Sequence, residues 1–368
     1  MTLTQPQVAP ARPAGGTYPT LLRLGHRYET TLGQLNALGR LRGAVDLIVG
    51  KDGWIYVLNR GSELPAHARL RIVRLNVKDE GYDREVAPDP EKTPAAPQKG
   101  SSTAPVMGAL DAEGVFHVTD EKANTVNMFR ITGEPAGFWG ETGAAPGQLD
   151  GPAGIALDID NTLWIADSRN HRVQHFTRDG RFISAWGEHG DQPGQMSFPW
   201  GIAIDPIDGT LVVADWRNDR IQRFSREGKV LACFGSSGSG PGELNRPSGV
   251  TVDNHSDIYV ADRNNHRVLL FNRRGVFVET FIGDATLNEQ GIQRLMGNPN
   301  MLRQRDNVSN LDREKRFKFP TAVKTNGDGL VFILDAGRHR IQVYRKLCRV
   351  LRADEVDPPE LHLDPMLN

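Results

Sequence analysis

Apolar residues occur in short runs of about five along most of the chain, and polar turns rich in Asp, Asn and Gly separate them. Runs of this length bounded by turn residues indicate β-strands, because a helix would need a longer segment with a 3.6-residue period. Turns such as Asp160-Asn161 and Asp179-Gly180 are typical of hairpins between antiparallel strands. One unit of this pattern is therefore predicted to be four antiparallel strands, at about 154–158, 163–166, 172–176 and 181–186.

The unit is repeated along the chain, and each copy has an Asp, or once an Asn, at the end of its second apolar run. The spacings between these positions are 61, 47, 48, 47 and 73 residues, so the base period is near 47. Four strands at this period are typical of a β-propeller blade. The pattern predicts an all-β, six-bladed β-propeller of four-stranded antiparallel blades, marked by Asn59, Asp120, Asp167, Asp215, Asp262 and Asp335.

A second repeated feature bears on how the ring closes. Gly followed by Gln or Glu and then Leu or Met comes after an outer strand at 147–149, 194–196 and 242–244, and again at 33–35, before the first blade. Residues 21–24 are therefore predicted to be the outer strand of the last blade, so that an N-terminal strand closes the ring. The alternative is that residues 347–351 take that position from the C-terminal side.

The spacing also predicts the domain organisation. We expect a disordered N-terminal tail over 1–17, one propeller over 18–351 and a C-terminal tail over 352–368. Three segments are longer than the repeat requires: the turn between Asn59 and Arg71, the Pro-rich loop 87–104 and the insertion 283–319. The last is predicted to act as a lid, with a capped helix beginning at Ser309.

All three additions are expected on one face of the ring. In an antiparallel blade, the turn between strands 2 and 3 and the link from strand 4 to the next blade emerge on the same side. Loops on a rigid scaffold are where binding residues usually lie. We call this side the insertion face and predict that it binds a partner or ligand.

Composition narrows the function classes. The chain has 44 basic and 45 acidic residues, and a net charge of −1 argues against nucleic-acid binding through bulk charge. The sequence has no run of 18 apolar residues, so no membrane span is predicted. It also lacks an apolar leader segment at its start, and we therefore expect a cytoplasmic protein. Two cysteines, Cys233 and Cys348, are too few for a disulfide framework or a Cys-based zinc site.

The units resemble NHL repeats, which have Pro-x-Gly, an inner strand, Asp-x-x-Asn-His-Arg and an aromatic-ended strand. Asp262, Asn265, His266, Arg267 and Phe271 match this pattern. A full match is also found at Pro152, Gly154, Asp167, Asn170, His171, Arg172 and Phe176. The units at Asp215, Asn218, Arg220 and Phe224 and at Asp335, His339, Arg340 and Tyr344 differ at one position each, where Asp219 replaces His and Arg338 replaces Asn. The first two units depart further, because Asn59 replaces the Asp in one and Thr125 replaces the Arg in the other.

The Asp and the Arg five residues later recur in four blades, as Asp167/Arg172, Asp215/Arg220, Asp262/Arg267 and Asp335/Arg340. A catalytic group would usually occur once, so we interpret these pairs as structural braces of the strand 2–3 turns. The recurring His171, His266 and His339 receive the same interpretation. His117 occupies the position of Trp164 and Tyr259 and is predicted to be a buried core residue.

The insertion face is also predicted to be basic and aromatic. Each strand 2–3 turn supplies a cation, and Trp200 and Trp216 lie close together in one unit, a candidate anchor for a partner. The candidate binding residues are Arg60, Lys122, Arg169, Arg217, Arg263, Arg338, Trp200, Trp216 and Asp46, the last being the one acidic residue placed at the start of an inner strand.

Two other function classes remain open. The fold resembles that of peptidyl-hydroxyglycine amidating lyase, which holds zinc through histidines at the x of Pro-x-Gly. Here those positions are Val45, Val106, Ala153, Trp200, Ser248 and Thr321, so any ligands would have to come from elsewhere, such as His26, His67 or the insertion. Lactonase-type propellers hold a divalent cation with several polar side chains, and Asp46 alone is too few.

We therefore predict a binding scaffold that has no cofactor or resident metal. Its ligand would be a protein, a small molecule or a polyanion on the basic face. The first alternative is a lyase or hydrolase, with Zn or Ca at a channel-mouth site under 283–319. The second is binding of RNA or another polyanion.

Overall fold

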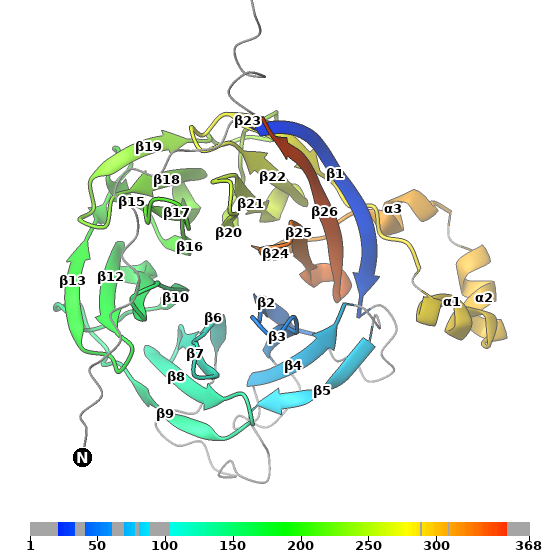
Figure 1. The fold of residues 1–368 in the computed structure, drawn as a ribbon, viewed down its shortest axis with the longest axis horizontal. Coiled ribbons are helices and arrows are strands. Elements are labelled where there is room, and N and C mark those ends of the chain that lie inside the picture. The colour runs from blue at the N-terminus through cyan, green and yellow to red at the C-terminus, as the bar shows by residue number, and fades with distance from the viewer. Residues whose placement is uncertain are drawn as a thin grey trace, which may run out of the picture.

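Six four-stranded antiparallel sheets stand around a common axis, like the blades of a propeller (Figure 1). The computed structural model describes residues 21–33, 41–60, 70–77, 81–87, 104–287, 289–307 and 309–351. The six-bladed fold predicted from the repeat is confirmed. Both predicted tails, the long turn of the first blade and nearly all of the Pro-rich loop lie outside the described residues.

Each of the first five blades runs from an inner to an outer strand in chain order. Blade 1 is β2 (Ala44–Val49), β3 (Ile55–Arg60), β4 (Leu70–Asn76) and β5 (Gly81–Ala87), and blade 2 is β6 (Pro105–Leu110), β7 (Val115–Asp120), β8 (Thr125–Arg130) and β9 (Pro135–Trp139). Blade 3 is β10 (Pro152–Leu157), β11 (Thr162–Asp167), β12 (Arg172–Thr177) and β13 (Phe182–Trp186), and blade 4 is β16 (Pro199–Ile204), β17 (Leu211–Asp215), β18 (Arg220–Phe224) and β19 (Val230–Phe234). Blade 5 is β20 (Pro247–Val252), β21 (Ile258–Asp262), β22 (Arg267–Phe271) and β23 (Phe277–Phe281). A short parallel pair, β14 (Glu188–His189) and β15 (Gln195–Met196), joins the link between blades 3 and 4.

Blade 6 combines the two ends of the described chain. Its order from the outside is β1 (Leu21–Leu32), β26 (Arg340–Val350), β25 (Leu330–Asp335) and β24 (Pro320–Thr325). In the antiparallel register, Leu21 pairs with Val350 and Leu32 pairs with Ile341. The predicted closure by an N-terminal strand is confirmed. The alternative is wrong, because residues 347–350 extend β26, the third strand, instead of forming a fourth.

Aromatic and aliphatic side chains fill the space between neighbouring blades. Tyr56 of blade 1 packs edge to face on Phe116 of blade 2, and both are fully buried. His117 is also fully buried, as predicted, and its Nε2 atom lies 3.1 Å from a carboxylate oxygen of Asp111. Near the axis the inner strands approach closely, since a Cβ on Gly201 would lie 2.2 Å from the carbonyl oxygen of Ser248. The close approach of the inner strands at this level therefore requires glycine at position 201.

The long insertion contains three helices, α1 (Glu289–Met296), α2 (Pro299–Asp306) and α3 (Leu311–Lys315). The N-cap of α3 is Asn310, whose side chain accepts a 3.1 Å hydrogen bond from the Arg313 N–H, so the cap predicted at Ser309 is one residue too early. In Figure 1 the helices lie beside blade 6, outside the ring, and they do not cross its axis. No helix among the described residues is long and apolar enough to cross a membrane.

Candidate functional site

The Asp–Arg pairs are part of a hydrogen-bond network inside each strand 2–3 turn. In blade 3, one carboxylate oxygen of Asp167 accepts a 2.7 Å bond from the N–H of Asp150. The other accepts bonds of 2.9 Å each from Asn170, Arg172 and Gln174. The Arg–Asp bond recurs at 2.8 Å for Arg220–Asp215, 2.7 Å for Arg267–Asp262 and 2.8 Å for Arg340–Asp335.

These pairs have little capacity left for an external ligand. Arg172 also donates to the carbonyl oxygens of Ala144, Ala145 and Gln148 in the incoming link. Burial raises the pKa of Asp167, and the hydrogen bonds from its partners oppose that rise. The network holds the link from the preceding blade against the turn.

The residue at the end of each turn connects one blade to the next. His171 adopts a left-handed conformation, with φ of 55°, and its Nδ1 atom accepts a 3.2 Å bond from the N–H of Phe198. His266 does the same for Phe319 at 3.1 Å. Asn124 accepts from Gly151 and Asp219 accepts from Arg246, each at 2.7 Å. In all four cases the donor also has a positive φ and directly precedes the proline that begins the next blade.

Three of the six predicted rim cations are neutralised inside the protein. Arg60 lies 2.8 Å from a Glu121 carboxylate oxygen, and Arg169 lies 3.1 Å from that of Asp150. Arg338 lies 2.5 Å from Glu314, which belongs to α3 of the insertion. Lys122 is exposed. The rim is therefore not a continuous ring of free positive charge.

Three of the remaining predicted residues, Trp200, Trp216 and Arg217, come together on blade 4. The ring centroids of Trp200 and Trp216 lie 5.9 Å apart, and the guanidinium carbon of Arg246 lies 4.9 Å from the ring centroid of Trp216. The Arg217 guanidinium group stacks on the Phe198 ring, with its central carbon 3.8 Å from the ring centroid. No carboxylate of the described residues forms an ion pair with Arg217 or Arg246. We call Phe198, Trp200, Trp216, Arg217 and Arg246 the aromatic–arginine patch. Arg263 forms a looser contact of the same kind, 5.9 Å from Phe319.

Asp46 is not part of that surface. It is fully buried, and it occupies the position at which blades 3, 4 and 5 have the Gly of Pro-x-Gly. One carboxylate oxygen accepts a 3.0 Å bond from the N–H of Gly108, and the other has no hydrogen-bond partner. The Lys324 ammonium group lies 3.9 Å from that second oxygen. Burial raises the pKa of Asp46, and the Lys324 charge opposes the rise.

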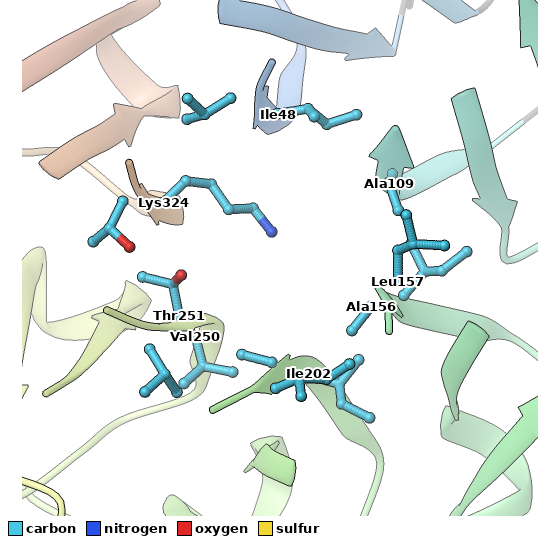
Figure 2. A pocket seen from close by; sticks show the side chains of 15 residues that line it. Ile48, Ala109, Ala156, Leu157, Ile202, Val250, Thr251 and Lys324 are labelled. Carbon is cyan, nitrogen blue, oxygen red and sulfur yellow. The ribbon is translucent and has the colours of Figure 1, made fainter. Parts of the chain in front are cut away.

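A pocket on the ring axis was not predicted from the sequence. Its volume is about 290 Å³, and the carboxyl-terminal halves of the six inner strands line it. Figure 2 shows the Lys324 side chain extending from β24 into this space, among aliphatic neighbours such as Ile48 and Ile202. Because inner strands begin at the insertion face, the pocket lies towards the opposite face.

The alternative metal ligands lie apart from the axis or cannot be placed. His26 is buried between blades 5 and 6, with its Nδ1 atom 2.8 Å from Glu279 and its Nε2 atom 3.0 Å from the Tyr259 hydroxyl. His67 lies outside the described residues. Within the described part of the chain, no three His, Cys, Asp or Glu side chains are grouped so that they could hold a metal ion.

Comparisons with known proteins agree with this architecture. The NHL repeat family model matches residues 149–176, 196–224 and 244–271, which fall in blades 3, 4 and 5. A search of curated protein sequences finds no match. With the repeats and the six blades together, the protein is an NHL-repeat β-propeller.

Solved structures share the fold at low sequence identity. A gluconolactonase from Xanthomonas campestris is 15% identical with a TM-score of 0.57, over 92% of this chain and 98% of that chain. Virginiamycin B lyase from Staphylococcus aureus is 15% identical with a TM-score of 0.51, over 88% and 100%. A protein of unknown function from Bacteroides thetaiotaomicron is 15% identical with a TM-score of 0.55, over 83% and 70%. These likenesses show the fold alone.

Proposed function

We propose that the protein is a binding scaffold that holds an acidic segment of a protein partner on its insertion face, at the aromatic–arginine patch. The observation that carries the proposal is the stacking of Arg217 on Phe198 beside the Trp200–Trp216 pair. In the part of the chain that the structure describes, neither Arg217 nor Arg246 forms an ion pair with a carboxylate. Tryptophan and arginine are the residues enriched at energetic hot spots of interfaces. The stacked arginines are already oriented, so less side-chain entropy is lost on binding.

The patch favours a protein partner over an RNA backbone. A polyanion is held best by a series of cations along its length. Here Arg60, Arg169 and Arg338 are neutralised by carboxylates, so the cations of the strand 2–3 turns do not form a continuous series around the rim. A compact patch of two indoles and two guanidinium groups fits a short segment in which an apolar side chain adjoins Asp or Glu.

The experiment is a selection from a display library of random 12-residue peptides, carried out in parallel on the wild type and on variants. The wild type is expected to enrich sequences with an acidic residue next to an apolar one. Trp216→Ala is expected to weaken a selected peptide by tenfold or more, in line with the roughly 2 kcal/mol of a hot-spot residue. Arg217→Glu should abolish binding, and Arg217→Lys should recover only part of it.

Lys122→Glu is the matched control, because Lys122 is an exposed cation of a strand 2–3 turn outside the patch. Equal binding by the wild type and Trp216→Ala would overturn the proposal. If no peptide is selected, but a 12-nucleotide single-stranded RNA binds with steep salt dependence and is lost in Arg217→Glu, RNA replaces protein as the ligand class.

The enzyme alternative gains no support from a specific contact. The gluconolactonase and the lyase share only the fold with this chain at 15% identity. The predicted cover for a channel-mouth site, the insertion, lies beside blade 6 and not over the axis (Figure 1).

A further inference from the structure

The axial pocket has one charged group in an otherwise aliphatic wall. Of the fifteen residues that line it, Lys324 is charged and two are threonines, Thr251 and Thr325. The other twelve are glycine, alanine, valine, leucine or isoleucine from the other five inner strands. In Figure 2 the Lys324 ammonium group points towards the middle of the space that these side chains surround.

The Lys324 ammonium group lacks a hydrogen-bonded counter-ion among the described residues. Its nearest carboxylate, Asp46, is 3.9 Å away, beyond hydrogen-bond distance. Within the described ranges, the Asp46 oxygen nearest to Lys324 has no hydrogen-bond partner; burial raises the pKa of this carboxyl, and the Lys324 charge opposes the rise. A cation in a mostly apolar wall is stabilised when an anion enters and forms charge-assisted hydrogen bonds with it.

The aliphatic residues that line the pocket determine the size and polarity of the ligand body that carries the anionic group. The pocket of about 290 Å³ holds about ten non-hydrogen atoms if each occupies roughly 30 Å³, the share of one water in the liquid. Aliphatic side chains gain from covering apolar atoms and offer few hydrogen bonds to a polar ligand body. The Lys324 side chain retains 23% exposure, so the ammonium group is reachable from solvent.

We propose that this pocket is a binding site for a small aliphatic monocarboxylate, whose carboxylate pairs with Lys324 and whose chain lies among the inner-strand residues. The site is separate from the aromatic–arginine patch. It lies at the other end of the inner strands and shares none of its residues.

The experiment uses octanoate, which has ten non-hydrogen atoms, with 1-octanol and octylammonium as probes of the same length and different charge. Titration calorimetry should show one octanoate per chain, weaker binding of 1-octanol and none of octylammonium. In methyl NMR spectra, octanoate should shift the Ile48, Ile155 and Ile202 signals and leave that of Ile292, exposed in α1, unchanged.

Substitutions separate the charge from the cavity. Lys324→Met should weaken octanoate at least tenfold and leave 1-octanol nearly unchanged, while Lys324→Arg should retain octanoate binding. Lys229→Met is the matched control, because Lys229 is an exposed lysine away from the axis. Ala156→Leu, which fills the pocket without touching the charge, should exclude both ligands.

Two outcomes would overturn the proposal. One is octanoate binding that is the same in Lys324→Met and in the wild type. The other is no octanoate binding at millimolar concentration by a wild type that is folded by circular dichroism. Trp216→Ala serves as a further control, since it should leave octanoate binding intact and thus distinguishes failure of this site from failure of the partner-binding patch.

Discussion

The imidazole of His171 in blade 3 accepts a 3.2 Å hydrogen bond from the backbone N–H of Phe198, the residue just before the first strand of blade 4. The bond requires a neutral ring nitrogen at Nδ1. Because the equivalent bond is made by His266, Asn124 and Asp219 in other blades, the side chain at this position carries a structural connection between blades.

Replacing His171 tests this connection. His171→Ala leaves the Phe198 N–H without its partner and puts alanine in the left-handed region, for a combined loss of about 2–3 kcal/mol in the free energy of unfolding. His171→Asn keeps an acceptor and tolerates this conformation, as Asn124 does in blade 2, so its loss should stay below about 1 kcal/mol. Urea unfolding measures both. Equal losses for the two variants would contradict the assigned bond.

The same residue predicts how stability depends on pH. Burial lowers the pKa of His171, and the charges of His189 and Arg217 lower it further. The folded state therefore binds less proton than the unfolded state near the ordinary histidine pKa of about 6.5, and stability should be full above that pH and fall as the pH drops below it. Unfolding curves at pH 7.5 and pH 5 and constant ionic strength should show a smaller pH effect in His171→Asn than in the wild type. An unchanged pH dependence would refute the role of this ring.

Asp215 is expected to be one of the most sensitive single positions. It is fully buried and accepts bonds from the Ser197 N–H and from Asn218, Arg220 and Gln222. Asp215→Ala leaves a guanidinium group without its carboxylate in a largely buried site, which costs about 3–5 kcal/mol. The control is Asp179→Ala in an exposed turn, which should change the urea midpoint little. Similar midpoints for the two variants would argue against the brace.

Deleting residues 1–33 tests the closure of the ring. The deletion removes β1, exposes the edge of β26 and breaks the 2.9 Å bond between Arg23 and Asp257 of blade 5. We expect a clearly lower urea midpoint and a tendency to aggregate through the free edge. A synthetic peptide of residues 21–33, added in excess, should raise the midpoint by binding the folded state, whereas a scrambled peptide should not. A deletion variant as stable as the wild type would show that β1 is dispensable.

The parts of the fold that the sequence predicts are those specified locally. Strand runs and Asp/Asn/Gly turns lie within a few residues of each other, so the repeat and the Gly33-Gln34-Leu35 signal were enough to predict six blades and their closure. The helices α1 and α2 have no counterpart in the repeat, and each has 8 residues, which is too short for a helical period to be recognised from the sequence. The cap of α3 was misplaced by one residue because Ser309 and Asn310 are both good N-caps.

The candidate site was harder to predict, because its electrostatics depend on partners distant in sequence. Arg60 is neutralised by Glu121, 61 residues away, and no local pattern connects the two. In the sequence Lys324 is an ordinary strand residue, and its place in the axial pocket follows only from the assembly of the six inner strands. The sequence therefore predicts which rim residues are basic or aromatic. It does not predict which of them are buried or which form ion pairs with carboxylates.

The joining of β1 with β26 also bears on how the chain is synthesised. Leu32 leaves the ribosome 309 residues ahead of its partner Ile341, a delay of about 15 to 60 seconds at 5–20 residues per second. During that interval the first strand has no neighbour to pair with, while blades 1 to 5 can already form. Completion of the last blade is then the folding step at which β26 can most easily pair with the β1 strand of another molecule. A closing strand supplied by another nascent chain would link two rings instead of completing one.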